Sequence, residues 1–324
     1  PYGEVRNGGY TYFAEGDFII AKITPCMENG KCAIAEGLTN GIGFGSSEFH
    51  TFRCHTSEIL TKFLFLLLNQ TTVRKAAEDA MTGASGHRRV PAAFYEEMLI
   101  PVPPIPVQQQ VIDECAKIDE EYNATRMRIE TYRQKTADLF AELDAVMSTT
   151  EGNRLSLSDT EKFSVAIGKR VLDKELVSDG SIPVYSANVA APFGFIDKLL
   201  ITDFSAPSVL WGIDGDWMTS YLPSDMPFYP TDHCGVLRCK NSEVNPRYLA
   251  HILEVEGRKM GFSRSYRASI DRVHGIAFTV PDISIQNNAM SKVADYEMAI
   301  KELEGSLEKI ASRRSEIIRK ALAE

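Results

Sequence analysis

The sequence predicts an α+β protein in which two α/β domains alternate with two long helices. One observation is a segment, 107–148, in which apolar residues recur every three or four positions without any Pro or Gly. A second is that the same pattern returns 178 residues later in the chain. A third is that the segments preceding both helices contain short strand-like stretches separated by turns.

The first helix, 107–148, carries two interleaved series of mostly apolar residues, each spaced by seven. The series are Val111, Ile118, Thr125, Tyr132, Leu139, Val146 and Cys115, Tyr122, Ile129, Thr136, Leu143. The second helix, 284–324, has Ala289, Tyr296, Leu303, Ile310, Ile317 and Val293, Ile300, Leu307, Arg314, Ala321. Such seams are typical of coiled coils. At ~1.5 Å per residue each helix is roughly 60 Å long, which suits a spacer. A freestanding dimerisation coil is the alternative, but the constant offset favours pairing within the chain.

The first domain, 1–106, reads as mixed α/β. Strands are expected at 17–23 and 48–54, with a glycine-rich turn at 41–45 between them. A helix over 59–68, continuing through 73–81, and a polar loop, 82–91, then lead to the strand before the first long helix.

The second domain, 149–283, repeats this plan with other side chains. Trp211-Gly212-Ile213 corresponds to Ala21-Lys22-Ile23, and Leu237-Arg238-Cys239 corresponds to Phe52-Arg53-Cys54. A helix over 246–260 and a polar loop, 264–272, match the helix and loop of the first copy. About forty residues at the start of the second domain have no counterpart, so we expect the first domain to lack its N-terminal part.

Composition excludes several function classes. The net charge of −9 argues against a generally basic nucleic-acid binder, although a local basic face remains compatible with it. No apolar run approaches the ~18 residues of a membrane span, and no signal peptide is recognisable, so a cytoplasmic chain is expected. The six cysteines lack the paired spacing of a zinc site, and Asp214 and Asp216 lack a third carboxylate, so no metal site is expected. Gly41, Gly43 and Gly45 lack the context of a phosphate-binding loop.

Several motifs together resemble the specificity subunit of type I restriction-modification systems. They are I-T-P-C-M-E-N-G-K at 23–31, G-I-G-F-G-S-S-E-F at 41–49, T-G-A-S-G-H-R-R-V-P at 82–91, P-P-I-P-V-Q-Q at 103–109, I-P-V-Y-S-A-N at 182–188 and V-L-W-G-I-D-G at 209–215. The family usually has Gln where this chain has His87. The missing start of the first domain is the other departure, and it fits a truncated chain or one cut from a longer protein, such as a methyltransferase fusion.

The resemblance implies a non-catalytic chain with two target-recognition domains, each reading half of a split site in double-stranded DNA. The two helices would pair antiparallel, hold the half-sites apart and dock DNA adenine methyltransferase and restriction (translocase-nuclease) subunits. S-adenosylmethionine, ATP and Mg²⁺ would belong to those partners, and no cofactor to this chain. The alternatives are a coiled-coil scaffold whose domains bind protein or carbohydrate, and the recognition tail of a single-chain restriction-methylation enzyme.

The candidate DNA contacts are basic and polar residues of the two matched loops and of nearby turns. Arginine can bind guanine or a phosphate, and serine can hold a phosphate oxygen. The candidates are Lys22, Lys31, Ser85, His87, Arg88, Arg89, Lys169, Arg170, Arg264, Tyr266, Arg267, Ser269 and Arg272. For the lysines a solvated surface is the competing interpretation, and for the loops a role in closing the junction between domain and helix. For at least one of Trp211 and Trp217 a place in the core is favoured over stacking on bases.

Overall fold

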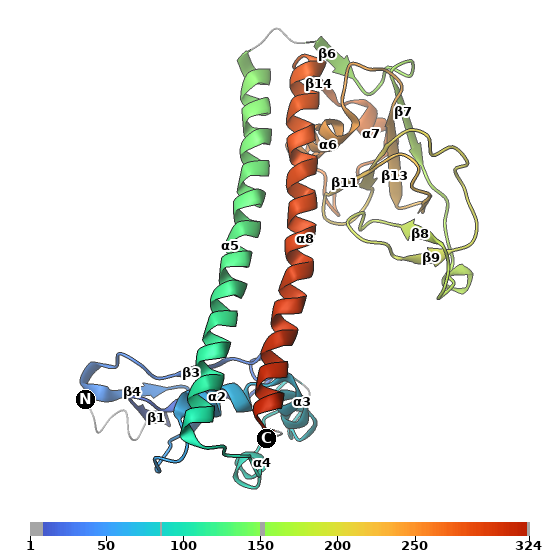
Figure 1. The fold of residues 1–324 in the computed structure, drawn as a ribbon. Coiled ribbons are helices and arrows are strands. Elements are labelled where there is room, and N and C mark those ends of the chain that lie inside the picture. The colour runs from blue at the N-terminus through green and yellow to red at the C-terminus, as the bar shows by residue number, and fades with distance from the viewer. Residues whose placement is uncertain (1–8, 85, 150–152, 323–324) are drawn as a thin grey trace. The chain divides into compact units, whose positions relative to one another are not determined.

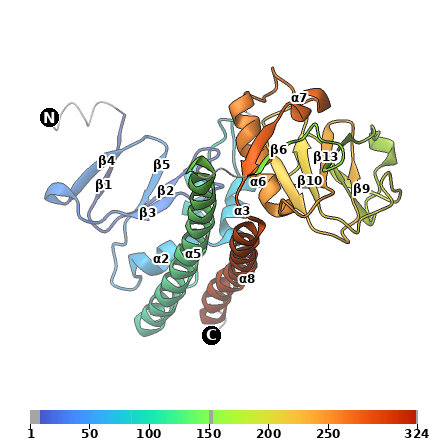
Figure 2. The same ribbon diagram turned by 90° about the horizontal axis from the view of Figure 1, so that it is seen from above.

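The computed structural model describes residues 9–84, 86–149 and 153–322. The chain forms two compact units, and both long helices pass through both of them. Unit 1 comprises residues 1–129 and 302–324, and unit 2 comprises residues 130–301. Each unit therefore joins one α/β domain to part of each long helix (Figures 1 and 2).

Unit 1 is built on a three-stranded antiparallel sheet in the order β3-β2-β5, accompanied by the β1-β4 pair. The strands are β1 (Thr11–Ala14), β2 (Phe18–Ala21), β3 (Cys32–Ile34), β4 (Ile42–Gly45) and β5 (Phe49–Phe52). The helices are η1 (Thr39–Gly41), α2 (Thr61–Leu68), α3 (Thr71–Asp79) and α4 (Ala92–Glu96). Phe18 and Ile20 of β2 are buried against Leu64 and Leu68 of α2, which fixes this helix on the sheet.

Three local predictions in unit 1 are wrong. The strand expected before the first long helix is absent, and residues 97–104 form neither strand nor helix, because Pro101, Pro103 and Pro104 have no N–H to donate to a sheet. The expected turn at 41–45 is mostly strand β4, because its glycines make room for an aromatic ring and do not form the turn: a Cβ on Gly43 would lie 2.3 Å from Cε2 of Phe13. The expected continuous helix is broken between α2 and α3, where Gln70 has extended backbone angles. No Pro or Gly marks this break in the sequence.

Unit 2 has a central four-stranded antiparallel sheet in the order β11-β10-β13-β7, a β12-β8-β9 sheet and the β14-β6 pair. The strands are β6 (Asn153–Ser156), β7 (Phe163–Ile167), β8 (Ile182–Tyr185), β9 (Gly194–Ile196), β10 (Ser208–Gly212), β11 (Thr219–Leu222), β12 (Tyr229–Pro230), β13 (Cys234–Cys239) and β14 (Ala277–Val280). The helices are η2 (Asp173–Glu175), α6 (Pro246–Met260) and α7 (Ile270–His274).

Helix α6 has the predicted bounds because its two ends are specified locally. The Asn245 side chain accepts hydrogen bonds from the first turn, Pro246 occupies the first position, and Gly261 ends the helix with a φ of 78°. Its apolar face packs on the sheet around Trp211, which is fully buried and donates from Nε1 to the carbonyl of Ala268. The core position favoured for one tryptophan is thus confirmed.

The long helices are α5 (Ile105–Thr149) and α8 (Ile283–Ala321), and they pair antiparallel as predicted. In unit 1 the beginning of α5 packs with the end of α8, where Val111 and Cys115 share a core with Ile318. In unit 2 the end of α5 packs with the beginning of α8, and the Tyr132 and Tyr296 rings lie 5.5 Å apart. Every residue of the predicted seams is buried or half-buried. From 123 to 138 all other α5 residues are exposed, so this stretch has the narrow contact stripe of a coiled coil.

Both long helices begin with the same buried glutamine, 178 residues apart. Gln108 and Gln286 are fully buried, and each makes three hydrogen bonds to backbone groups. In unit 1 the partners are Leu60 N–H (2.9 Å), Glu58 C=O (2.7 Å) and Pro103 C=O (2.7 Å). In unit 2 they are Asn245 N–H (2.9 Å), Glu243 C=O (3.0 Å) and Pro281 C=O (2.8 Å). The glutamine ties the long helix to the N-terminus of the helix that covers the sheet.

The predicted α+β fold, two α/β domains alternating with two paired long helices, is confirmed. The boundaries proposed at residues 106, 148 and 283 remain an interpretation of the sequence. Among the described helices, none combines the length and apolar character that crossing a membrane requires.

Candidate nucleic-acid interface

In unit 1 the polar loop 82–91 is fixed to the end of the central strand β2. Lys22, just after β2, donates its N–H to the Glu48 carbonyl (2.9 Å) and accepts from the Val90 N–H (2.9 Å). Thr82 and Arg89 bond to each other in both directions across the base of the loop (3.0 and 2.8 Å). The loop is therefore a narrow hairpin with an exposed tip.

In unit 2 the polar loop 264–272 is fixed in the same way. Ile213, just after β10, donates its N–H to the His233 carbonyl (3.0 Å) and accepts from the Ala268 N–H (2.9 Å). Val90 and Ala268 are 178 residues apart (268 − 90), the offset that also relates the long helices. The hydrogen bonds thus make Arg89 equivalent to Arg267, and Glu48 equivalent to His233.

Both arginines predicted as DNA contacts in unit 1 are engaged inside the domain. Arg88 donates from Nη2 to the carbonyl of Glu78 (2.8 Å) near the C-terminus of α3, where a cation is favourable. Arg89 donates from Nε and Nη2 to the Glu48 carboxylate, both at 2.8 Å. This pairing holds the pKa of Glu48 below its usual value, with smaller contributions from the charges of neighbouring groups that include Lys22. His87 at the loop tip is exposed, and Ser85 lies outside the described residues.

The two lysines predicted in unit 1 lie at the same end of the sheet. Lys22 is half-buried, and its backbone bonds to Glu48 and Val90. Lys31 is exposed just before β3. Lys31 and Glu48 line a mainly apolar hollow of about 400 Å³ beside β2. One edge of the sheet thus holds Lys31, Glu48 and the Arg89 side chain that donates to Glu48.

In unit 2 the loop arginines pair with the turn that follows β10. Arg267 donates from Nη2 to Asp214 (3.2 Å), and Asp214 also bonds Nδ1 of His233 (2.7 Å). Arg264 lies 3.6 Å from Asp216 with both side chains largely exposed, so this pair is weak.

An aromatic residue stiffens the same loop. The Arg272 guanidinium lies 3.9 Å from the centre of the Tyr266 ring, and it donates to the Arg267 carbonyl (2.7 Å). The Tyr266 ring in turn stacks on Phe262 at 5.9 Å. Arg272 therefore supports the position of Arg267, whose own side chain faces solvent.

Lys169 and Arg170 are exposed and follow strand β7 directly. The Lys169 N–H donates to the Pro230 carbonyl (3.1 Å), and the preceding Gly168 N–H donates to the Cys234 carbonyl (3.2 Å) at the start of β13. These two cations thus lie at the same end of the sheet as His233. Ser269 is half-buried at the start of α7, below the loop.

Sequence reasoning missed two residues of this interface, Glu48 and His233. Glu48 begins a predicted strand and is part of a family motif, and neither pattern marks it as a contact. His233 precedes Cys234, and that pairing suggests no more than the zinc site that the cysteine spacing excludes. Both directly precede the strand that pairs with the central strand, β5 in unit 1 and β13 in unit 2. Alignment of those two strands could have identified the pair.

The structure provides no competing metal site in the part of the chain that it describes. No group of three or more His, Cys, Asp or Glu residues there could hold a metal ion. The six cysteines are free thiols, and burial raises the pKa of Cys234 to about 12. A thiol of that kind is a poor nucleophile near neutral pH.

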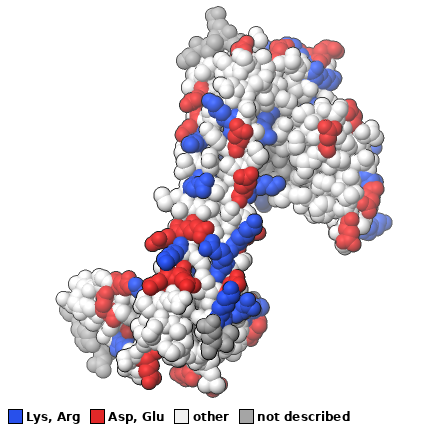
Figure 3. Space-filling view, viewed as in Figure 1, with Lys and Arg blue, Asp and Glu red and all other residues white. Residues whose placement is uncertain are grey.

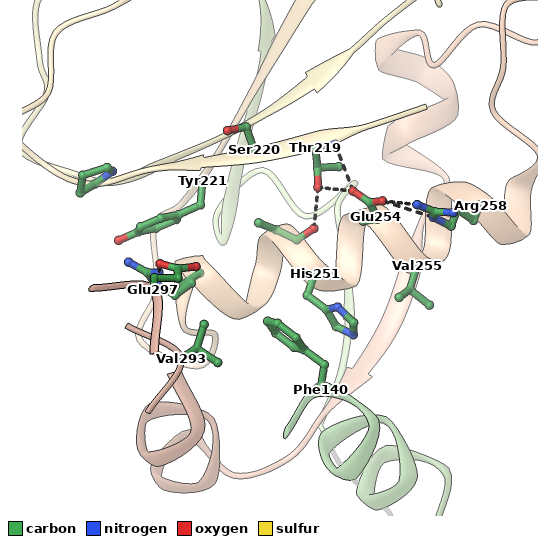
Figure 4. Close-up of a pocket in the computed structure, with 13 residues that line it drawn as sticks. Phe140, Thr219, Ser220, Tyr221, His251, Glu254, Val255, Arg258, Val293 and Glu297 are labelled. Carbon is green, nitrogen blue, oxygen red and sulfur yellow. Dashed lines mark hydrogen bonds and ion pairs between the residues drawn. The ribbon is translucent and has the colours of Figure 1, made fainter. Parts of the chain in front are cut away.

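A hollow of about 720 Å³ lies between β11, α6 and the long helices in unit 2 (Figure 4). Its charged walls are paired: Arg247 forms an ion pair with Glu297 and lies 4.6 Å from the centre of the Tyr221 ring. His251 stacks on Phe140 at 4.1 Å. These contacts join the α/β domain to the helices, which explains them without a ligand.

Basic and acidic side chains are interspersed over the described residues on the face shown in Figure 3. The mixture agrees with the net charge of −9. Any DNA contact must therefore come from local groups such as those at the two loops.

Comparison with known proteins places the chain beside one group. No family model matches the sequence. The specificity subunit of the type I restriction enzyme EcoAI of Escherichia coli is 48% identical over 104 residues, 32% of this chain and 18% of that protein. The specificity subunit of the E. coli enzyme EcoEI is 36% identical over 146 residues, 44% of this chain and 24% of that protein. The chain thus spans about a fifth of the length of these relatives.

The fold comparison agrees. The crystal structure of a type I restriction-modification S subunit from M. genitalium superposes with a TM-score of 0.58 at 15% identity. The match covers 96% of this chain and 84% of that one, so the two share a fold over nearly the whole chain.

Proposed function

The predicted resemblance to type I specificity subunits is confirmed in sequence and in fold, and from it we propose that the chain reads DNA for a type I restriction-modification enzyme. Each unit would bind one half of a bipartite site through the loop at the end of its central sheet. DNA adenine methyltransferase and restriction subunits would supply the catalysis and bind S-adenosylmethionine, ATP and Mg²⁺.

One observation carries the proposal: in both units an exposed loop is held to the end of the central strand by equivalent backbone hydrogen bonds and carries an arginine at the equivalent position. Val90 and Ala268 fix the loops, and Arg89 and Arg267 each meet a carboxylate. A carboxylate that holds a guanidinium reduces the conformational freedom lost when the arginine meets a phosphate or a guanine. Two such loops on one chain suit a site with two separated parts.

The long helices support the second half of the proposal. Between residues 123 and 138 of α5, only the seam residues are buried or half-buried, and all the others are exposed. We assign these exposed polar faces to the partner subunits. Because paired helices resist bending, they would also set the gap between the half-sites as a length.

Selection from a random-sequence duplex pool tests the proposal, with and without a type I methyltransferase subunit. We expect two short half-sites at one fixed gap. Binding should weaken steeply with salt, because each neutralised phosphate releases condensed counterions. A chain that shows no salt-dependent binding in either condition would contradict DNA recognition.

The ion pairs at the loops favour a second candidate, a scaffold whose domains bind protein or carbohydrate. Arg89, Arg264 and Arg267 all have acidic partners, which lowers the positive potential of both loops. That candidate would gain support if the selection returned no sequence and the added methyltransferase subunit still bound the chain.

A further inference from the structure

We propose that His233 is a phosphate contact whose proton makes DNA binding by unit 2 depend on pH; this inference rests on the proposed function. His233 was not among the predicted DNA contacts. It lies at the same end of the central sheet as the loop 264–272, and its backbone carbonyl holds Ile213 as Glu48 holds Lys22 in unit 1.

The two units use this shared position differently. In unit 1 the position holds the acid, Glu48, which Arg89 neutralises through two hydrogen bonds. In unit 2 the position holds a base, and the acid has moved to Asp214 on the neighbouring turn. Asp214 lies between two bases, His233 at 2.7 Å and Arg267 at 3.2 Å.

Exposure separates the roles of these three groups. The side chain of Asp214 is 20% exposed, whereas His233 is 47% and Arg267 is 64% exposed. The acid is thus the inner member and the two bases face solvent. Asp214 is the positioning residue, and His233 and Arg267 are the groups that can reach a ligand.

The hydrogen bond to Asp214 fixes which nitrogen carries the first proton. A carboxylate only accepts, so Nδ1 of His233 is the donor. Nε2 then accepts when the ring is neutral and donates when the ring is charged. A phosphate oxygen only accepts, so the contact through Nε2 requires the charged ring. DNA binding would therefore take up a proton and tighten as pH falls.

The other charged groups around the ring are Asp232, whose carboxylate lies 3.9 Å from Nε2, and Arg267, which shares Asp214. With the ring neutral, the cluster of His233, Asp214, Asp232 and Arg267 carries a net charge of −1, and with the ring protonated it carries none, so the proton removes the negative charge that would oppose a phosphate. In unit 1 this position holds Glu48, which is already paired with Arg89, so at this position only unit 2 offers a histidine that can take up a proton.

The test measures binding of the full chain to the random-sequence duplex pool across a salt series at pH 6 and at pH 8. His87, the exposed loop histidine of unit 1, is itself a predicted DNA contact, so every chain in the test carries His87→Gln. For the chain that keeps His233 we expect the slope of log K against log salt to be steeper at pH 6 by about 0.9, the value of one phosphate contact. His233→Gln should remove this difference and weaken binding about five-fold at pH 6, since it deletes one charged phosphate contact.

Two further variants separate a charge effect from a structural one. His233→Lys is charged at both pH values, so it should show the steeper slope at both. His55→Gln, an exposed histidine in unit 1, should keep the difference between pH 6 and pH 8. A merely structural His233 would not be restored by lysine.

The outcomes distinguish this inference from the proposed function. Salt-dependent binding with equal slopes at both pH values, or a pH difference that survives in His233→Gln, would overturn the role of His233 and leave DNA recognition intact. If binding did not depend on salt at pH 6 or at pH 8, both the role of His233 and the proposed DNA recognition would be overturned.

Discussion

Replacing Gln286 by leucine tests how each α/β domain is held to its long helix. The side chain is fully buried, and its three hydrogen bonds satisfy one backbone N–H and two carbonyls at 2.8–3.0 Å. Leucine has a similar volume but satisfies none of them. A buried backbone group left without a partner costs about 1–3 kcal/mol, and the added apolar burial returns about 1 kcal/mol. We expect Gln286→Leu to lower the free energy of unfolding of unit 2 by about 3 kcal/mol.

Tryptophan fluorescence during urea unfolding measures this effect in one unit, because the two tryptophans, Trp211 and Trp217, both lie in unit 2. With a urea m-value of about 2 kcal/mol/M, the midpoint should fall by about 1.5 M. Gln134→Leu is the matched control in the same unit: Gln134 is exposed on α5 and its side chain donates to Asp138, so the tryptophan midpoint should move by less than about 0.3 M.

The equivalent change in unit 1, Gln108→Leu, adds a second comparison. If the units unfold separately, it should leave the tryptophan transition in place and shift the far-ultraviolet circular dichroism transition instead. A shift of the tryptophan midpoint by Gln108→Leu as large as that by Gln286→Leu would mean that the shared helices make unfolding cooperative. If Gln286→Leu stayed within about 0.5 kcal/mol of the unaltered chain, the reasoning from its hydrogen bonds would be refuted.

Three further predictions concern the unit 2 loop, the stability of the fold at low pH and the length of the long helices. Arg267→Ala should weaken DNA binding about ten-fold in anisotropy titrations, the loss of one good contact, without moving the unfolding midpoint; a shifted midpoint would assign Arg267 a structural role. Asp17 accepts two hydrogen bonds from Arg53, which lowers its pKa from 3.8. The stability it contributes is therefore present above about pH 4 and lost as pH falls through the lower folded value. Urea unfolding from pH 7 to pH 2.5 should show this loss, and Asp17→Asn should reduce it; an equal loss in both chains would exclude Asp17. Inserting one heptad into each long helix adds about 10 Å, so selection should return half-sites about 3 base pairs further apart; an unchanged gap would show that the helices do not set it.

The long-range organisation was readable from the sequence because it depends on repetition. A seam repeats every seven residues and recurs at a fixed offset, so the helices could be identified without knowing what covers them. The same offset of 178 relates Gln108 to Gln286 and Val90 to Ala268. Helix α6 could be bounded because its cap residues, Asn245 and Gly261, act locally.

Several errors arose where distant residues decide the local structure. Gly43 belongs to a strand because the Phe13 ring needs its space, and Phe13 is thirty residues earlier. Arg88 looked like a free loop cation, yet its guanidinium bonds the end of α3. His233 gave no signal of its own, because its importance comes from Asp214 and Arg267 on other segments. Charge and loop character alone do not show which side chains already have partners.

Comparison of the two units separates the residues that hold the loops in place, which form the frame, from the exposed side chains that are candidates for DNA contact. The positions that hold the frame keep their chemistry: glutamine occupies the base of both helices, and small apolar residues, Val90 and Ala268, are buried behind both loops. The positions that face solvent differ, with an acid at Glu48 where unit 2 has His233. A frame fixed by backbone hydrogen bonds tolerates such exchanges, because the loop keeps its place whichever side chain it presents. Under the proposed function, two copies of one frame would therefore present different donors and acceptors to DNA, and a chain built this way would suit a site whose two halves are unlike.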